Sequence, residues 1–179
     1  IGIASRKGGV GTTTIALNLG SALLRFGADN IVLDANLSSP HLGMHLGSPR
    51  NASTIHGFLK GRCSMSEAVH YHAASGLKVI PGDISPRSPF DSKNDHFYDH
   101  FSRIKRNIPG FSFVIADLPS LAHPSGRASL ALPTELLLVT TADLPSVIEA
   151  AKAAQEADAL HIPITGVVVN MLRHESSEL

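Results

Sequence analysis

Short apolar runs separated by helical patterns repeat along the whole chain. The runs that predict strands are residues 1–5, 30–34, 77–81, 112–117, 136–141 and 165–170. Several of them are almost continuously apolar, which is typical of strands in a sheet covered on both faces. Apolar residues at helical spacing predict helices over about 12–26, 97–107 and 145–160. The repeated order of strand, helix and strand predicts a three-layer α/β domain with a mostly parallel, doubly wound sheet.

The segments between these elements, and the two ends of the chain, are less regular. Residues 38–76 and 85–96 are rich in Ser, Pro, Gly and His, so we expect loops with short helices there. The chain begins inside one apolar run and ends shortly after another. We therefore expect residues 1–179 to form a single domain whose terminal segments are incomplete.

The composition fits a globular domain and excludes several classes of protein. Hydrophobic residues make up 43% of the 179 and charged residues 17%. Fifteen basic residues balance fifteen acidic ones, so no overall field attracts nucleic acid, and we expect no nucleic-acid partner. The single cysteine, Cys63, excludes an intramolecular disulfide and suits a reducing cytoplasm. Because no apolar run reaches roughly 18 residues, we expect no transmembrane helix, and we expect no signal peptide.

Polar residues gather where the predicted strands end. They lie in segments 5–13, 34–36, 117–120 and 141–143 and at Asn170. Ligands of parallel sheets bind beyond the carboxyl ends of the strands, which all lie at one edge. This convergence predicts a single ligand site at that edge.

A glycine-rich loop joins the first predicted strand to the first predicted helix, and its sequence is Lys7-Gly8-Gly9-Val10-Gly11-Thr12-Thr13. Glycines let the backbone approach phosphate oxygens, while successive N–H groups and the positive end of the helix hold the anion. Thr13 is placed to offer its hydroxyl to Mg²⁺. A turn that only opens the helix is the alternative, but the lysine, the threonines and nearby Asp34 favour a phosphate-binding loop.

A dinucleotide-binding loop is a second alternative, because Asp34 ends the second strand about where a ribose-binding carboxylate would lie. The glycine pattern argues against it, since Gly9 and Gly11 fit but Thr14 stands where the third glycine belongs. Lys7 would also have no role in such a loop. The P-loop interpretation is therefore favoured.

The segment KGGVGTTT resembles the deviant Walker A loop, KGGxGKT, of the MinD/ParA group of P-loop ATPases, and the likeness continues along all 179 residues. VLDANLSSPHLGMHLG resembles the switch I stretch of the group, and FVIADLPS resembles its Walker B strand and switch II. LLLVTTADLPSVIEA is similar to its segment VTTPExxSVxDA, and GVVVN to the strand whose final Asn reads adenine. PHLGMHLG and LKVIPGD are more similar to MinD-like proteins than to ParA.

The resemblance implies a P-loop NTPase fold and an ATP-operated switch that acts in spatial organisation or cell division. It implies binding of ATP or ADP with Mg²⁺ by the loop residues Gly8, Gly9, Val10, Gly11, Thr12, Thr13 and Thr14, and recognition of adenine by Asn170. The residues expected near the metal are Thr13, Asp34 and Asp117. The residues expected at the reaction are Lys7, Asn36 and Asp117.

The resemblance also implies partners and a location. Members of the group sandwich two nucleotides between subunits, so we expect a homodimer, or a dimer with a related ATPase, in which Lys7 reaches the partner's phosphates. A protein regulator fits such a switch. We expect a cytoplasmic protein, and attachment at the inner face of the cell membrane follows from family analogy alone.

The chain departs from the group at several positions. Thr12 replaces the lysine that contacts the β- and γ-phosphates, and Asn36 replaces the aspartate that orients or activates the attacking water. Leu121 replaces the switch II glycine, Ala142 a proline near the base, and His41 an asparagine. Losing one charge-stabilising donor costs about 100- to 1,000-fold in rate, and an amide cannot accept a proton. We therefore expect weak or absent ATP hydrolysis.

Three functions remain open at this point. The first is an ATP-binding switch with weak hydrolysis, and the second is a pseudo-ATPase that serves as a structural or regulatory partner subunit. The third is a metabolic P-loop enzyme, for which the sequence offers no clear substrate pocket. Arg6 could replace part of the charge lost at Thr12, but we expect it to be a solvated loop residue.

Overall fold

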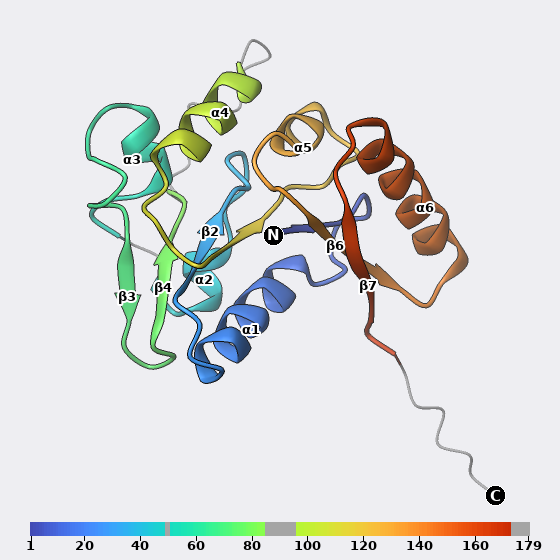
Figure 1. The fold of residues 1–179 in the computed structure, drawn as a ribbon, viewed down its shortest axis with the longest axis horizontal. Coiled ribbons are helices and arrows are strands. Elements are labelled where there is room, and N and C mark those ends of the chain that lie inside the picture. Colours follow the sequence, from blue (N-terminus) through green and yellow to red (C-terminus); the bar gives the residue numbers. More distant parts are fainter. Residues whose placement is uncertain (49–50, 85–95, 173–179) are drawn as a thin grey trace, which may run out of the picture.

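A computed structural model of the chain describes residues 1–48, 51–84 and 96–172 (Figure 1). Within these residues one sheet has the strand order β3-β4-β2-β5-β1-β6-β7. The strands are β1 (Gly2–Ala4), β2 (Asn30–Asp34), β3 (His70–His72), β4 (Leu77–Ile80), β5 (Phe113–Asp117), β6 (Leu136–Thr141) and β7 (Ile164–Asn170). The helices are α1 (Thr12–Arg25), α2 (Leu42–His45), α3 (Ile55–Leu59), α4 (Phe97–Asn107), α5 (Pro124–Ser129) and α6 (Leu144–Ala159). Every neighbouring pair is parallel except β3 and β4, which confirms the mostly parallel sheet.

Helices cover both faces of the sheet, so the molecule has two apolar cores. Ile31 and Leu33 of β2 belong to the core on the side of α3, α4, α5 and α6. Val32, between them, belongs to the core on the side of α1 and α2. Since successive side chains of a strand point to opposite faces, a strand buried on both sides must be apolar throughout. This arrangement confirms the three layers and the doubly wound topology.

Helix α1 positions the glycine-rich loop, and it begins and ends close to where the sequence predicts. Gly11 caps its N-terminus with a φ of 96°, and Gly27 follows its C-terminus with a φ of 79°. Both angles lie in the left-handed region that favours glycine. Halfway along, a Cβ at Gly20 would lie 2.7 Å from Cγ2 of Val32, so the helix packs closely against β2. The N-terminus of α1 is thereby fixed relative to the ends of the strands.

Two short elements, β3 and α5, are not marked by the sequence pattern. Helices α2 and α3 are the short helices expected within residues 38–76, but His70–His72 pairs antiparallel with β4 instead of forming a loop. No apolar alternation marks this strand, because backbone pairing to β4 holds it and Gly76, with a φ of 74°, closes the turn. Residues 85–95 of the second expected loop lie outside the described residues.

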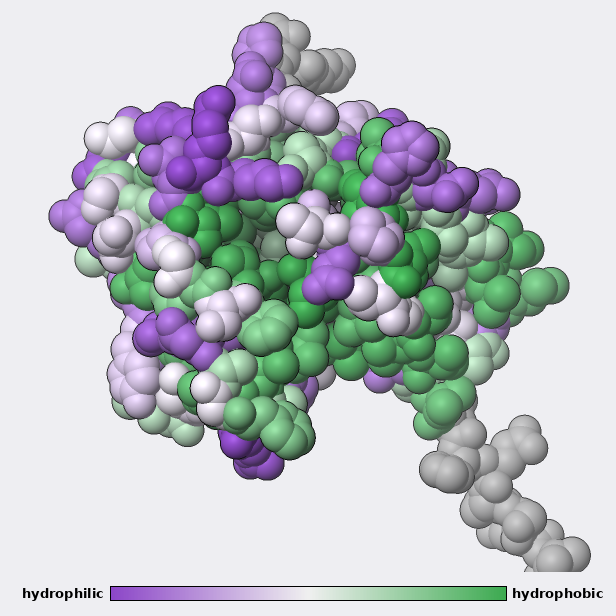
Figure 2. All heavy atoms as spheres, in the orientation of Figure 1, coloured by the Kyte–Doolittle hydropathy of each residue, from purple (hydrophilic) through white to green (hydrophobic). Residues whose placement is uncertain are grey.

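Strand β7 forms one edge of the sheet within the described residues. It pairs only with β6, and its Val167 and Val169 are 56% and 46% exposed. Figure 2 shows apolar surface over this side of the molecule. None of the described helices combines the length and the apolar character needed to cross a bilayer.

Candidate nucleotide-binding site

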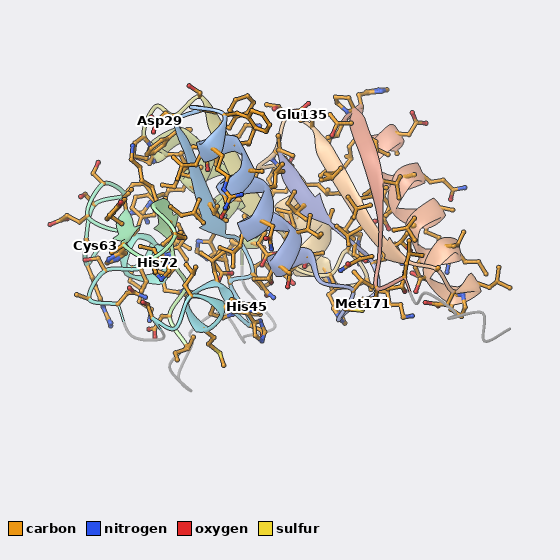
Figure 3. All side chains as sticks on the ribbon, turned by 90° about the horizontal axis from the view of Figure 1, so that it is seen from below. Asp29, His45, Cys63, His72, Glu135 and Met171 are labelled. Atoms are coloured by element: carbon orange, nitrogen blue, oxygen red, sulfur yellow. The ribbon has the colours of Figure 1, made fainter. Side chains whose placement is uncertain are left out.

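A cavity of about 510 Å³ opens at the carboxyl ends of the strands, where the sequence predicts a ligand site. Its lining residues are Ser5, Lys7, Gly8, Gly9, Gly11, Thr12, Thr13, Thr14, Asn36, His41, His45, Leu118, Ser120 and Met171. His45 on α2 and Met171 after β7 both lie at this edge in Figure 3, whereas Asp29 and Glu135 mark the opposite edge. The structure therefore brings the glycine-rich loop, switch I and the start of switch II around one space.

The loop has the backbone shape that phosphate binding requires. Gly9 has a φ of 76° and Gly11 a φ of 96°, while Gly8 has nothing within 4 Å of the position of a Cβ. Successive N–H groups in such a conformation form a concave nest for an anion. A Cβ at Gly11 would lie 2.5 Å from Nδ2 of Asn170, which itself donates a 2.8 Å hydrogen bond to the carbonyl of Val10. Asn170 thus braces the loop, and adenine recognition by its side chain stays a prediction.

Thr13 lines the cavity, and its side chain contacts the buried Asp117. The Thr13 hydroxyl donates a 2.5 Å hydrogen bond to Oδ2 of Asp117. Oδ1 of Asp117 is buried and has no hydrogen-bond partner among the described residues. Such an atom is costly unless a cation or water satisfies it when the site is filled. Burial raises the pKa of Asp117, because the buried site disfavours the charged form of the carboxyl group. A bound cation would stabilise that charged form.

Asp34 lies beside Asp117 at the end of β2 and is fully buried. Its carboxylate accepts hydrogen bonds from the backbone N–H groups of Asn36 at 3.2 Å and Leu42 at 2.9 Å. Burial first, and the neighbouring charge of Asp117 second, raise the pKa of Asp34 to about 8. Two neighbouring carboxylates and one threonine hydroxyl are oxygen donors of the kind that Mg²⁺ prefers. The residues present therefore fit a magnesium ion near Thr13.

Three of the substituted positions, Thr12, Asn36 and His41, line the same cavity, whereas Leu121 is buried in the apolar core. Thr12 lines the cavity, so the position of the usual lysine faces the space where phosphates are expected. The Asn36 side chain also lines it, but its Oδ1 accepts a 3.1 Å hydrogen bond from the N–H of Ser39. In this structure Asn36 therefore stabilises the switch I turn. A role of Asn36 at the reaction remains a prediction.

Lys7 makes contacts that the sequence does not predict. Its Nζ lies 3.0 and 3.1 Å from the two carboxylate oxygens of Asp143 and 2.6 Å from Oγ of Ser146, all in the same chain. Asp143 also caps α6, accepting from the Ser146 N–H at 3.0 Å and from the Thr141 hydroxyl at 2.5 Å. Hydrogen bonds from Thr141, Ser146 and Lys7 hold the pKa of Asp143 well below its usual range. The lysine expected to reach a partner's phosphates is thus held at the start of α6.

The expectation for Arg6 is wrong. Its side chain is only 16% exposed and forms ion pairs with Glu149, at 2.9 Å, and with Glu156. The two glutamates lie seven residues apart on α6, so they share one face of the helix. Arg6 follows β1, which neighbours β6, and this topology brings it against α6. Its charge is therefore neutralised within the protein.

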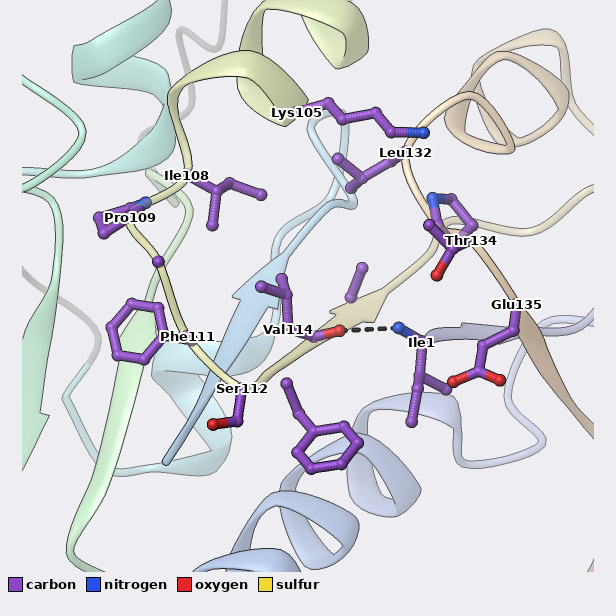
Figure 4. A pocket seen from close by; sticks show the side chains of 14 residues that line it. Ile1, Lys105, Ile108, Pro109, Phe111, Ser112, Val114, Leu132, Thr134 and Glu135 are labelled. Atoms are coloured by element: carbon purple, nitrogen blue, oxygen red, sulfur yellow. Dashed lines mark hydrogen bonds between the residues drawn. The ribbon is translucent and has the colours of Figure 1, made fainter. Parts of the chain in front are cut away.

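A second cavity, of about 410 Å³, lies at the opposite edge of the sheet (Figure 4). The Ile1 amino group lies in its wall and donates a 2.8 Å hydrogen bond to the carbonyl of Val114. The single carboxylate among its lining residues is that of Glu135. Neither a glycine-rich loop nor a helix N-terminus faces it, so the phosphate-binding features belong to the first cavity.

Comparison with known proteins agrees with this geometry. The family described as "CobQ/CobB/MinD/ParA nucleotide binding domain" matches residues 1–179 of the chain. The chain belongs to this family. An uncharacterized ATP-binding protein of Methanocaldococcus jannaschii is 29% identical to it over 179 residues, which are the whole chain and 66% of that protein. The septum site-determining protein MinD of Thermotoga maritima is 32% identical over 150 residues, which are 83% of this chain and 54% of that protein.

A solved structure of the CobQ/CobB/MinD/ParA family has the same fold. It is the septum site-determining protein MinD of Pyrococcus horikoshii complexed with Mg-ADP, with a TM-score of 0.83 and 22% sequence identity. The match covers 99% of this chain and 71% of that one. The P-loop NTPase fold expected from the resemblance is thereby confirmed. The chain spans about two thirds of the relatives that it matches over its whole length.

The sequence does not reveal the role of Asp143 as the partner of Lys7. The sequence places Asp143 at the ligand edge without giving it a role, although Asp-Leu-Pro-Ser is a recognisable helix start. Because Asp143 is the N-cap of α6 and follows the carboxyl end of β6, its carboxylate can pair with a cation at the ligand edge. Only the strand order β1-β6 identifies Lys7 as that cation.

Proposed function

We propose that this protein is a MinD/ParA-like switch that binds ATP or ADP together with Mg²⁺ at the cavity beside α1. The observation that carries the proposal is the buried Oδ1 of Asp117, which has no hydrogen-bond partner among the described residues and lies beside Thr13, the last residue of the glycine-rich loop. A buried carboxylate oxygen is stabilised by a cation, and the N–H groups of the glycine-rich loop are stabilised by an anion. A magnesium–nucleotide complex supplies both at once.

The residues of this chain divide the binding between them. The backbone of Gly8–Thr13 and the N-terminus of α1 hold the phosphates, and the Thr13 hydroxyl and Asp117 hold the metal region. When bound, Mg²⁺ neutralises phosphate charge and links it to the protein. Asn170 holds the loop through a hydrogen bond to Val10, and recognition of adenine by its side chain is part of the proposal.

We further propose that hydrolysis is weak or absent. Thr12 offers a hydroxyl where a lysine would stabilise developing charge, which costs about 100- to 1,000-fold in rate. The Asn36 amide cannot take a proton from water, and its oxygen is already engaged by Ser39. The switch therefore depends on the binding and release of nucleotide more than on rapid hydrolysis of ATP.

Calorimetric titration with ATP and with ADP, each with and without Mg²⁺, tests the proposal. The purified protein should bind both nucleotides with a dissociation constant of about 1 μM, and only with Mg²⁺ present. Asp117→Asn should weaken the magnesium-dependent binding, whereas Asp99→Asn, at an exposed position of α4, should leave it unchanged. Absence of binding in a folded, nucleotide-free sample refutes the proposed function.

A partner and a cellular role follow as part of the same proposal. We propose an ATP-linked homodimer, or a dimer with a related ATPase, that works in spatial organisation or cell division under a protein regulator. The MinD relatives support this role. Light scattering with and without Mg-ATP tests the dimer, and Lys7→Ala should abolish a nucleotide-linked increase in mass.

The second candidate is a pseudo-ATPase that acts as a structural or regulatory partner subunit. The contact between Lys7 and Asp143 favours it, because a lysine held within its own chain is not available to a partner's phosphates. This candidate predicts a dimer whose mass is the same with and without nucleotide. The light-scattering experiment therefore separates the two functions.

A further inference from the structure

The cavity has few cations at the place where phosphates are expected. Thr12 stands in the position of the usual lysine. The guanidinium of Arg6 is bound to two glutamates of α6, and the Lys7 amine is bound to the first turn of the same helix. Of the described residues that line the cavity, the remaining side chains able to carry positive charge are His41 and His45.

The ring of His45 is oriented by its own helix. Its Nδ1 lies 3.1 Å from the carbonyl oxygen of His41, one turn earlier in α2. A carbonyl oxygen can only accept, so Nδ1 carries a hydrogen and donates it. Nε2 makes no hydrogen bond to another described residue. It is the ring atom that a ligand in the cavity can reach.

The charged groups around His45 come from four parts of the chain. Asp34 lies beneath α2 at the end of β2, Asp117 lies at the end of β5, Lys7 lies in the loop, and His41 lies on the same helix. Burial raises the pKa of Asp117, and positive charge on His45 and His41 acts in the opposite direction. The imidazole is therefore within electrostatic range of the end of the cavity that fits the metal and the terminal phosphates. The α1 residues that line the cavity contribute hydroxyl groups and no ionisable side chain.

We propose that His45 binds the phosphate chain of a nucleoside di- or triphosphate through Nε2, and so replaces part of the charge that is missing at Thr12. The inference rests on the proposed function, since it concerns a ligand of the same cavity. Because Nδ1 already donates to His41, Nε2 donates to a phosphate oxygen only when the ring is doubly protonated. A bound phosphate oxygen therefore favours the doubly protonated ring, so affinity should be higher at lower pH.

Calorimetric titration with ATP at saturating Mg²⁺, at about pH 6 and about pH 8, tests this assignment. At the lower pH the unaltered protein should bind about tenfold more tightly than His45→Ala, and at the higher pH the two should converge. His45→Lys should bind tightly at both pH values. His96→Ala removes an exposed histidine outside the cavity and should match the unaltered protein. Asp34 and Asp117 also titrate, but they are common to all these proteins, so the differences isolate His45.

Two results would overturn the inference, and they are distinguishable. If the unaltered protein binds ATP but His45→Ala binds equally well at both pH values, His45 does not contact the phosphates and the proposed function survives. If neither the unaltered protein nor Thr12→Lys binds ATP, both the proposed function and the role of His45 are wrong. His45 is exposed, so its replacement should not unfold the protein, and circular dichroism of each variant checks this.

Discussion

The buried carboxylate of Asp34 should make the metal-free protein less stable as the pH rises. Its pKa lies at about 8 in the folded protein, above the ordinary value of 3.8, because of burial and then the charge of Asp117. Between these two values the folded protein holds a proton that the unfolded chain releases. The stabilising effect of that proton is present at acidic pH and is lost as the pH rises through about 8.

The size of the effect follows from the same numbers. From pH 7 to pH 9 the protonated fraction of Asp34 falls from about nine tenths to about one tenth, and the linkage relation gives a loss of about 1.4 kcal/mol in the free energy of unfolding. The pKa of Asp117 is also raised, so its contribution has the same sign. Burial lowers the pKa of His56, whose protonation destabilises the fold at lower pH, so this window avoids it.

Urea unfolding at pH 7, 8 and 9 in the presence of a chelator measures this loss. The unaltered protein should lose about 1.4 kcal/mol more over the window than Asp34→Asn, which is neutral at every pH. The comparison cancels the titrating groups that do not interact with Asp34, because both proteins share them. Parallel pH profiles for the two proteins would mean that Asp34 is ionised in the fold at neutral pH, and the reasoning from burial would be refuted.

Three further substitutions test the geometry of the site. Thr12→Lys should tighten ATP binding by about 10- to 100-fold in calorimetry, since it adds a charge-assisted contact to phosphate; unchanged affinity would show that this position does not face the phosphates. Asp143→Asn keeps the helix cap but releases the loop lysine, so ATP-linked dimerisation measured by light scattering should strengthen by about 1.5- to 5-fold, and no change would mean that the contact does not restrain the lysine. Gly126→Ala should lower the stability by about 1–3 kcal/mol in thermal unfolding, because a Cβ there overlaps the Ser120 carbonyl; Gly110→Ala, which meets nothing within 4 Å, is the control, and equal melting temperatures would contradict the packing.

The sequence predicts the central sheet and α1 because local physical signals mark them. The strands are buried on both faces, so their apolar residues are continuous, and Gly11 and Gly27 stand where the backbone needs a positive φ. The pattern does not mark β3, since an edge strand is held mainly by backbone pairing with its neighbour. His70–His72 carries no apolar alternation that could reveal it.

The candidate site likewise has one part that the sequence predicts and one part that it does not. Its phosphate loop is predictable because one short segment contains all the geometry. The partners of Arg6 and Lys7 lie more than 130 residues away and become neighbours only because β1 and β6 are adjacent in the sheet. The hydrophobic periodicity of the sequence does not show that β1 and β6 are neighbours. A strand order, once known, would be enough to pair Lys7 with the N-cap of α6.

The charges of the site, taken together, determine how the protein should discriminate between forms of its ligand. Asp117 and Asp34 lie buried beside Thr13 and supply no positive charge, while the charges of Arg6 and Lys7 are neutralised by acidic groups of α6 and its N-cap. The nest and the end of α1 offer only partial positive charge. Much of the positive charge that a triphosphate needs must therefore arrive with the ligand, in the form of its magnesium ion. A site of this composition should discriminate between Mg-ATP and free ATP more strongly than a P-loop that retains its lysine. It follows that Thr12→Lys should tighten the binding of free ATP by a larger factor than the binding of Mg-ATP.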